Sequence, residues 1–198
     1  MSAESARANA PEGERVDRVR QRRVRTAELS ETEVAAIRAM LVAAFGPDED
    51  ECFTDEDWDH AVGGLHVVAD LDGSILAHAS VVERTIRVGG RPLRTGYVEA
   101  VATAPGRQGA GIGTRVMEDV GAYIRDTFEL GALGTGVQRF YERLGWVTWL
   151  GPTSVLTADG ERRTPEGDGL IMVLPTPASP ALDLTAPIEC EWRPGDVW

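Results

Sequence analysis

The sequence holds 198 residues, of which 42% are hydrophobic and 26% charged, a size and composition typical of one globular domain. No apolar run approaches the roughly 18 residues that a membrane-spanning helix requires, which excludes integral helical membrane proteins. The formal net charge of −12 repels nucleic acid and anionic lipid and attracts cationic ligands, which argues against a nucleic-acid or membrane partner.

The charge is spread unevenly along the chain. Residues 1–25 carry seven arginines and four acidic residues, whereas the rest carries 13 arginines and 28 acidic residues. Because residues 1–23 lack apolar periodicity and any stretch of signal-peptide length, we expect a disordered arginine-rich tail there and a single domain over 24–198. The acidity of that domain has two explanations, solubility alone or attraction of a cationic ligand, and both stay open.

The cysteines and histidines form no recognisable ligand set. Cys52 and Cys190 lack metal-ligand spacing, and one disulfide would be a poor scaffold for this length, so reduced thiols in a cytoplasmic protein are expected. His60, His66 and His78 follow no metal-binding pattern, and we interpret them as structural or surface residues. The sequence predicts no metal site.

Two helices are predicted early in the domain. Ser30 and Glu33 match a capping box, and the apolar residues that follow recur at helical spacing until Gly46 and Pro47 end the helix. The acidic segment 48–59 then closes in a short helix with Thr54 as N-cap. We interpret this segment as an insertion that could face a ligand.

Alternating apolar residues between turn residues predict the strands. They are expected over residues 24–27, 65–69, 75–88, 94–103, 130–133, 146–150 and 170–174. Tight turns at 70–73 and 89–92 make an antiparallel meander of the second, third and fourth. Residues 112–127 and 137–144 have the periodicity of helices, and the chain after residue 174 is interpreted mainly as a proline-bearing tail.

A glycine loop opens the helix predicted from residue 112. Its residues are Gln108, Gly109, Ala110, Gly111, Ile112 and Gly113. Exposed N–H groups and the positive end of a helix dipole favour a pyrophosphate, although a glycine-rich turn alone is more often only a turn. The spacing is neither GxGxxG nor a P-loop. The QxxGxG pattern after an antiparallel meander resembles the acyl-CoA pyrophosphate loop of the GNAT acetyltransferase superfamily.

That resemblance extends to Tyr141 and Glu99. The run from Phe140 to Trp146 is similar to the YxxxGF segment of GNAT proteins, where the tyrosine can protonate the departing thiolate; periodicity alone would make Tyr141 a packed aromatic. Glu99 is a lone carboxylate in an apolar strand, either at a solvent-facing edge or functional, as an acceptor of the amine proton. The backbone of Val101, Ala102 and Thr103 would hold the pantetheine arm, with the Val101 N–H polarising the thioester carbonyl.

A narrower resemblance covers residues 24–198. The segments that carry it are Phe53–Thr54, Asp57–Trp58, Gly96–Glu99, Gly131–Leu133, Gly151–Leu156, Arg163–Pro165 and Trp192–Trp198. They look like the aminoglycoside 2'-N-acetyltransferases of mycobacteria and relatives. The resemblance implies an acidic substrate pocket, whose residues by position are Cys52, Asp57, Glu99, Ala100, Gly134, Glu166, Asp168, Asp196 and Trp198 with its terminal carboxylate.

Departures from that family at three places bear on the acceptor. Cys52 stands where relatives carry an acidic residue, although Asp50 and Glu51 precede it, and Gly134–Gly136 replaces a serine-rich turn. Residues 166–168 hold two acids where relatives hold three. The departures imply a different aminoglycoside range, weaker binding, or another polyamine.

The resemblance implies a GNAT fold, an α/β (α+β) protein with a mixed, mostly antiparallel sheet flanked by helices. It also implies acetyl transfer from acetyl-CoA to the 2'-amine of an aminoglycoside, and a homodimer. Two alternatives are a GNAT enzyme acting on a cellular polyamine or amino sugar, and a non-catalytic acyl-CoA-binding module. No covalent acyl-enzyme is expected, because no cysteine or serine lies in a recognisable nucleophile setting.

Overall fold

The computed structural model describes residues 18–46 and 52–198; residues 1–17 of the predicted tail, and Asp50 and Glu51, lie outside this part. Within it, ten strands form one sheet in the order β6-β9-β5-β4-β3-β10-β7-β8, with β1 and β2 extending from β3. The prediction of a mixed, mostly antiparallel sheet is confirmed, since only β4–β5 and β7–β10 pair in parallel. The strands are β1 Arg20–Arg25, β2 Leu65–Leu71, β3 Ser74–Val88, β4 Arg91–Thr103, β5 Leu130–Gly134, β6 Val147–Thr148, β7 Thr153–Thr157, β8 Gly160–Arg163, β9 Ile171–Pro175 and β10 Ile188–Glu191.

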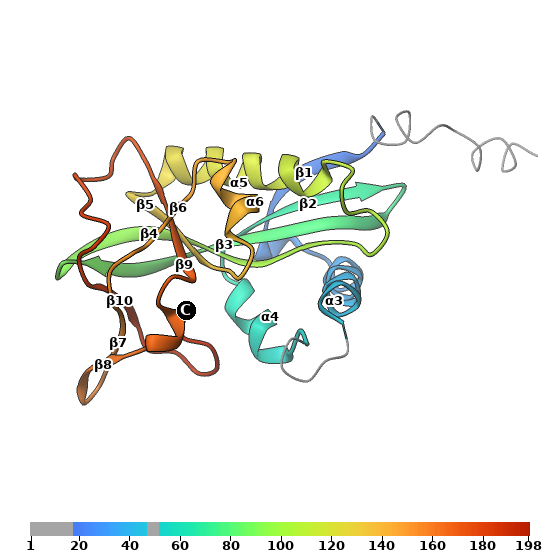
Figure 1. Cartoon of the computed structure of the whole chain (residues 1–198). Helices are drawn as coiled ribbons and strands as arrows, with labels where there is room; N and C mark the ends of the chain where they lie inside the picture. Colours follow the sequence, from blue (N-terminus) through green and yellow to red (C-terminus); the bar gives the residue numbers. More distant parts are fainter. Residues whose placement is uncertain (1–17, 47–51) are drawn as a thin grey trace, which may run out of the picture.

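Helices cover both faces of this sheet (Figure 1). The amphipathic helix α5, Ile112–Thr127, lies along one face, and α3, Glu31–Phe45, lies with α4, Asp55–Ala61, on the other. Separate apolar clusters fill the two layers, one around α5 and one around α3 and α4. The short helix α6, Gln138–Glu142, precedes β6. Among the described helices, none combines the length and apolar character needed to cross a membrane.

Both predicted N-caps are confirmed. The Ser30 side chain accepts from the Glu33 N–H, and the Glu33 carboxylate accepts from the Ser30 N–H at 2.9 Å. Thr54 and Asp57 repeat the arrangement at the start of α4, where the Asp57 carboxylate accepts from the Thr54 N–H at 2.8 Å. Such reciprocal caps satisfy helix N–H groups that have no partner within the helix. The cap contacts therefore orient the Asp57 side chain in the first turn of α4.

The first strand starts at Arg20, four residues before the predicted strand, so the predicted tail does not reach residue 23. Its arginines pair with acids on neighbouring elements: Arg20 with Asp70 at 3.2 Å and Arg23 with Asp119 at 2.6 Å. The sequence prediction extended the tail too far because an arginine-rich segment without an apolar pattern has the composition of a solvated tail. The carboxylates that pair with these arginines lie far along the chain, so they could not be recognised from the sequence.

The C-terminal third contains more sheet than the sequence indicates. Strands β7, β8 and β10 have no counterpart among the predicted strands, and β6 is reduced to two residues. Strand β10 lies between β3 and β7, so the interpretation of this region as a tail was wrong for 188–191. A run of four residues after a proline-rich stretch is too short for periodicity to detect. Because β10 lies within the sheet, the residues that follow it, 192–198, lie at the centre of the molecule.

The sheet is interrupted in β4, where the functional residues lie. Ser80 of β3 pairs with Glu99, but the next pair is His78 with Ala102, so Ala100 and Val101 form a bulge opposite Ala79. The parallel pairing of β4 with β5 ends at the pair formed by Tyr97 and Ala132, although β4 continues for six more residues. Bulges re-aim side chains and terminate pairing, and this one lies where β4 and β5 separate.

Two of the three histidines are fully buried. His66 and His78 are 0% exposed, and burial lowers the pKa of His66 to about 4 and that of His78 to about 3. His60 instead lies on α4, where its Nε2 donates to the Pro194 carbonyl at 2.8 Å. The interpretation of all three as structural or surface residues fits this placement.

The buried pair makes stability depend on pH. The folded pKa values lie below the usual value of about 6.5, so the unfolded chain binds protons that the folded chain does not, and stability falls as pH drops below 6.5. The two histidines should lower the free energy of unfolding by about 3 kcal/mol between pH 6.5 and 5. Burial raises the pKa of Glu99 to about 7, so this carboxyl group binds a proton in the folded state over the same range and acts in the opposite direction. Urea unfolding midpoints of the Glu99→Gln variant at pH 7, 6 and 5 therefore isolate the contribution of the histidines. Equal midpoints at all three would contradict burial of two neutral imidazoles.

Candidate active site

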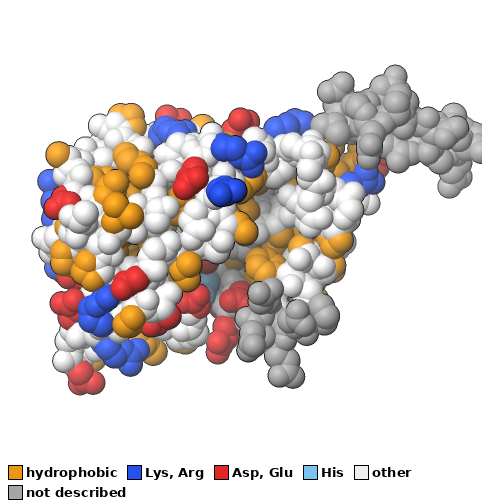
Figure 2. Space-filling view, viewed as in Figure 1, with side chains coloured by type: hydrophobic (Ala, Val, Ile, Leu, Met, Phe, Trp, Pro, Cys, Tyr) orange, Lys and Arg blue, Asp and Glu red, His pale blue; other side chains and the backbone are white. Residues whose placement is uncertain are grey.

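A pocket of about 810 Å³ opens where β4 and β5 separate. It is walled by β4 and β5, by α4, by Tyr141 of α6 and by the C-terminal segment. In Figure 2, acidic side chains gather around the hollow in the middle of the face shown. The lining residues are Phe45, Cys52, Phe53, Asp57, Tyr97, Val98, Glu99, Ala100, Val101, Leu133, Gly134, Thr135, Gly136, Val137, Tyr141, Glu166, Gly167, Leu170, Ile171, Asp196 and Trp198.

The structure brings most of the predicted site residues together in this pocket. All three predicted catalytic residues line it: Glu99, Val101 and Tyr141. Of the nine predicted substrate-binding residues, only Asp168 is not in the lining. Ala102, Thr103 and residues 108–113, predicted to bind the coenzyme, lie beyond this lining, along the end of β4 and the start of α5.

Glu99 is paired with an arginine that the sequence analysis mentioned only as part of the C-terminal run. Arg193 Nη1 lies 2.6 Å from Glu99 Oε1, and each side chain is 15% exposed. Burial raises the pKa of Glu99 to about 7, although Arg193 acts in the opposite direction. The carboxyl group is therefore poised between its two protonation states near neutral pH, as suits a group that accepts and releases a proton.

Arg193 also organises the C-terminal segment. Its Nε donates to the Asp196 carbonyl at 2.7 Å and its Nη2 to the Trp198 carbonyl at 3.4 Å. One guanidinium thereby joins β4 to the last residues of the chain. Its place in the C-terminal run was the available signal for its role, but the separation of residues 99 and 193 along the chain hides their contact in the sequence.

Tyr141 reaches the pocket from α6 and is 6% exposed. Its ring packs edge-on against Phe140 and Trp146, so the packing suggested by periodicity is present in a side chain that also lines the pocket. Burial raises the pKa of Tyr141 to about 12. The hydroxyl consequently stays protonated at neutral pH and can serve as a proton donor.

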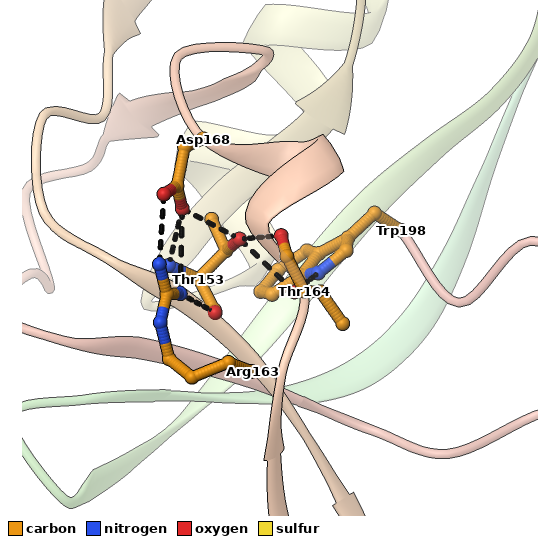
Figure 3. A network of polar contacts seen from close by, with 5 residues as sticks. All are labelled: Thr153, Arg163, Thr164, Asp168 and Trp198. Atoms are coloured by element: carbon orange, nitrogen blue, oxygen red, sulfur yellow. Dashed lines mark hydrogen bonds and ion pairs between the residues drawn. The ribbon is translucent and has the colours of Figure 1, made fainter.

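Trp198 is held by a polar network beside the pocket (Figure 3). Its indole Nε1 donates to Thr164 Oγ1 at 2.8 Å, and Thr164 donates to Thr153. Asp168 belongs to this network: it accepts from the Thr153 N–H at 2.9 Å and pairs with Arg163 at 2.8 Å. These contacts lower the pKa of Asp168, first through the Thr153 N–H and then through Arg163. Asp168 is thus placed to support Trp198 rather than to face the pocket.

The start of α5 has the backbone that the glycine pattern predicts. Gly109 and Gly111 both have φ of +79°, a conformation that L side chains rarely adopt, and Gly111 is the N-cap of the helix. At Gly113 an added Cβ would lie 2.7 Å from Thr103 Oγ1, so this residue allows close contact between the helix and the end of β4. Gln108 Nε2 reaches the Thr103 carbonyl at 3.5 Å. Free N–H groups at such a helix start can bind a pyrophosphate.

Tyr97 was missed as a site residue. It is 1% exposed, lines the pocket, and its hydroxyl has no hydrogen-bond partner among the described residues. Two guanidinium groups lie near its ring, those of Arg84 at 4.7 Å and Arg193 at 5.6 Å from the centroid. In the sequence Tyr97 is one of several strand residues with the periodicity of a core position, and nothing distinguished it.

Comparison with known proteins agrees with this geometry. Residues 24–148 match the family model described as an acetyltransferase (GNAT) domain. The chain is 43% identical over 181 residues to an aminoglycoside 2'-N-acetyltransferase of Mycolicibacterium fortuitum, covering 89% of this chain and 91% of that protein.

Solved structures with similar folds include two with the coenzyme bound. One is the GNAT family N-acetyltransferase YhbS from Escherichia coli in complex with CoA, with a TM-score of 0.62 and 16% identity over 87% of this chain and 89% of that one. Another is a GNAT family acetyltransferase from Brucella melitensis in complex with acetyl-CoA, with a TM-score of 0.50 and 22% identity over 80% and 97% of the two chains. At these identities the likeness concerns the fold, and it confirms the fold that the resemblance implied.

Proposed function

The chain belongs to the GNAT acetyltransferases, and within them to the family of the aminoglycoside 2'-N-acetyltransferases; from this we propose that it transfers the acetyl group of acetyl-CoA directly to the 2'-amine of an aminoglycoside. The observation that carries the proposal is a pocket lined by four carboxylate side chains at the point where β4 and β5 separate. Those residues are Asp57, Glu99, Glu166 and Asp196.

The donor half of the proposal rests on β4 and the start of α5. The N–H groups around Gly109 and Gly111 would bind the pyrophosphate of acetyl-CoA. The β4 edge left unpaired beyond Tyr97 would take the pantetheine arm, whose amides can replace the missing strand partner. Acetyl-CoA supplies an activated thioester, and the protein has to orient it toward the pocket.

The acceptor half rests on charge. A polyamine that enters the pocket exchanges water for carboxylates, and an ammonium group paired with a partly buried carboxylate gains more than one paired at the surface. Asp57 is partly buried, whereas Asp196 is exposed. The Asp57 carboxylate is oriented by its cap contact with Thr54, and that of Asp196 accepts from the Trp198 N–H at 3.1 Å. Fixed carboxylates of this kind favour one orientation of a polycation over others.

We assign three residues to the transfer step. Glu99, in its ionised form, accepts the amine proton directly or through a water while the nitrogen attacks the thioester carbonyl. The Val101 N–H stabilises the oxyanion as the C–N bond forms. The C–S bond then breaks, and Tyr141 gives its proton to the thiolate and regains one from solvent. No acyl-enzyme is formed.

A matched pair of aminoglycosides tests the proposal. Kanamycin B and kanamycin A differ only in carrying an amine or a hydroxyl at position 2'. With acetyl-CoA, thiol release should be rapid with kanamycin B and at least about 100-fold slower with kanamycin A, because the nucleophile is missing. Spermidine and glucosamine in the same assay represent a cellular polyamine and an amino sugar.

The other outcomes separate the alternatives. Equal rates with both kanamycins would reject transfer to the 2'-amine. Faster turnover of spermidine or glucosamine than of kanamycin B would favour a cellular acceptor. Binding of acetyl-CoA without thiol release with any amine would favour a non-catalytic acyl-CoA-binding module.

The departures at Cys52 and Gly134–Gly136 lie in the pocket lining, so they bear on the acceptor range. An uncharged side chain at 52 and two glycines at 134 and 136 leave less charge and more room than acidic and serine residues would.

A cytoplasmic location and a homodimer also stay predictions, and sedimentation of the purified chain tests the homodimer.

A further inference from the structure

Two buried imidazoles connect the N-terminal end of the domain with the bulge of β4. His66 of β2 and His78 of β3 lie side by side, with His66 Nδ1 2.9 Å from His78 Nε2. His66 Nε2 lies 2.8 Å from Thr26 Oγ1, and His78 Nδ1 lies 2.8 Å from the carbonyl oxygen of Ala100. The transfer chemistry proposed above uses neither ring.

The carbonyl at one end sets the direction of this hydrogen-bond chain. The Ala100 oxygen can only accept, so His78 Nδ1 carries a proton. In the neutral ring His78 Nε2 then accepts, so His66 Nδ1 donates and His66 Nε2 accepts from the Thr26 hydroxyl. This contact is shorter than the 3.3 Å from the same hydroxyl to the Gly64 carbonyl, which the Thr26 N–H also binds. Each ring is thereby held in one tautomer, and each has both nitrogens satisfied.

The residue at the end of the chain has an unusual backbone. Ala100 has φ of +51°, one of two non-glycine residues with positive φ in the described part of the protein. A side chain in this region costs of order 1 kcal/mol or more and persists only when its surroundings hold it. The holding contacts come from β3: His78 binds the Ala100 carbonyl, and Ser80 Oγ donates to the Glu99 carbonyl at 3.2 Å.

The same imidazoles lie against the helix that carries one of the pocket carboxylates. The indole of Trp58, on α4, lies 5.9 Å from the His66 ring and 6.4 Å from the His78 ring between centroids. Asp57, the neighbouring residue, lines the pocket. The histidine pair therefore packs between the helix that carries an acceptor carboxylate and the strand that carries Glu99 and Val101.

We propose that His78, oriented by His66, is a positioning residue for acetyl transfer: by binding the Ala100 carbonyl it keeps the β4 bulge in place, and with it the Glu99 carboxylate and the Val101 N–H. This inference rests on the proposed function. It assigns to the pair a role in the rate of transfer in addition to packing.

The first test compares two replacements of His78. His78→Asn keeps an N–H donor near the position of Nδ1, whereas His78→Phe keeps a ring without a donor. His78→Phe should lower kcat by about 10- to 100-fold, because a reacting group displaced by about 1 Å can cost that much. His78→Asn should keep kcat within about 5-fold of native. The KM for acetyl-CoA should change little in both.

Glycine at position 100 provides a rescue. It adopts positive φ without a Cβ penalty, so a bulge with glycine should need less support from His78. Measured against Ala100→Gly alone, adding His78→Phe should lower kcat by only about 3-fold or less. A double-mutant cycle isolates this coupling.

Val67→Ala, which removes buried volume from the opposite face of β2, controls for general destabilisation and should leave kcat near native.

The inference can also be judged without turnover. A long-range ¹H–¹⁵N spectrum of the native protein should show both imidazoles protonated at Nδ1 and unprotonated at Nε2, and His78→Phe should speed hydrogen exchange at the β4 amides that pair with β3 on either side of the bulge. If His78→Phe does not fold, this spectrum and the His78→Asn rate decide.

Opposite tautomers would overturn the inference. So would a His78→Phe loss of the same size with glycine at 100, or equal losses in His78→Phe and Val67→Ala. Absence of thiol release with every amine in the native protein would instead overturn the proposed function, while the spectrum and the exchange rate would still test the positioning role.

Discussion

Replacing Glu99 by glutamine is expected to lower kcat/KM for kanamycin B by about 10²- to 10⁴-fold, the usual contribution of a general base. Glutamine has nearly the same shape and can still accept a hydrogen bond from Arg193, so the guanidinium keeps a partner. Affinity for CoA, measured by calorimetry, should stay within about 3-fold of native, because Glu99 faces the acceptor side.

The pH profile sharpens this prediction. Because burial raises the pKa of Glu99 to about 7 and the ionised form is the base, kcat/KM of the native enzyme should rise with pH through about 7. The glutamine variant should lose that ionisation. Glu166→Gln is the matched control, since it removes a carboxylate from the lining without removing the proposed base. It should raise KM and preserve both kcat and the profile. Equal profiles for native protein and Glu99→Gln would reject Glu99 as the base.

Replacing Tyr141 by phenylalanine is the second large effect expected. The variant should keep the edge-on packing against Trp146 but lose the proton donor, so kcat should fall by about 10²-fold. The KM for the aminoglycoside should change little, because the hydroxyl acts on the leaving thiolate. Pre-steady-state thiol release measures the chemical step directly.

Tyr123→Phe is the control for loss of a phenol. Tyr123 lies on α5 and is not among the residues that line the pocket, so its variant should have native kcat. A Tyr141→Phe variant with native rates of thiol release would contradict the role of Tyr141 as proton donor. Equal losses in the two variants would point to a general effect of removing a tyrosine hydroxyl.

The parts of the fold that sequence predicted well are those governed by local rules. The capping boxes at Ser30 and Thr54 set the starts of α3 and α4, and alternation with tight turns predicted the meander. Helix α5 was predicted over the same residues that it occupies, 112–127, because an amphipathic face and a glycine N-cap both mark it. Each of these signals lies within a few residues of its element.

The parts that sequence missed depend on distant contacts. Strand β1 is stabilised by carboxylates such as Asp70 and Asp119, and β10 exists because β3 and β7 are both available as partners. The pairing of Arg193 with Glu99 is of the same kind. Local periodicity carries no information on which distant partner a segment meets.

The candidate site was predicted largely by family resemblance, and physical reasoning from single residues left alternatives. Glu99 could have been a solvent-facing strand residue, but its side chain is only 15% exposed and is paired with Arg193. Asp168 was grouped with the acceptor ligands by its position in the family resemblance, yet its carboxylate accepts from the Thr153 N–H. The histidines carried no signal in the sequence, because the role that we propose for them depends on the backbone conformation of Ala100.

The most direct test of acetyl transfer to the 2'-amine is the position of the acetyl group in the product. Kanamycin B should be incubated with acetyl-CoA and the purified chain until one equivalent of thiol is released, and the product then assigned by two-dimensional NMR. The account predicts a single monoacetylated product with the amide at the 2' nitrogen. An acetyl group on any other nitrogen, or a mixture of positions, would contradict it.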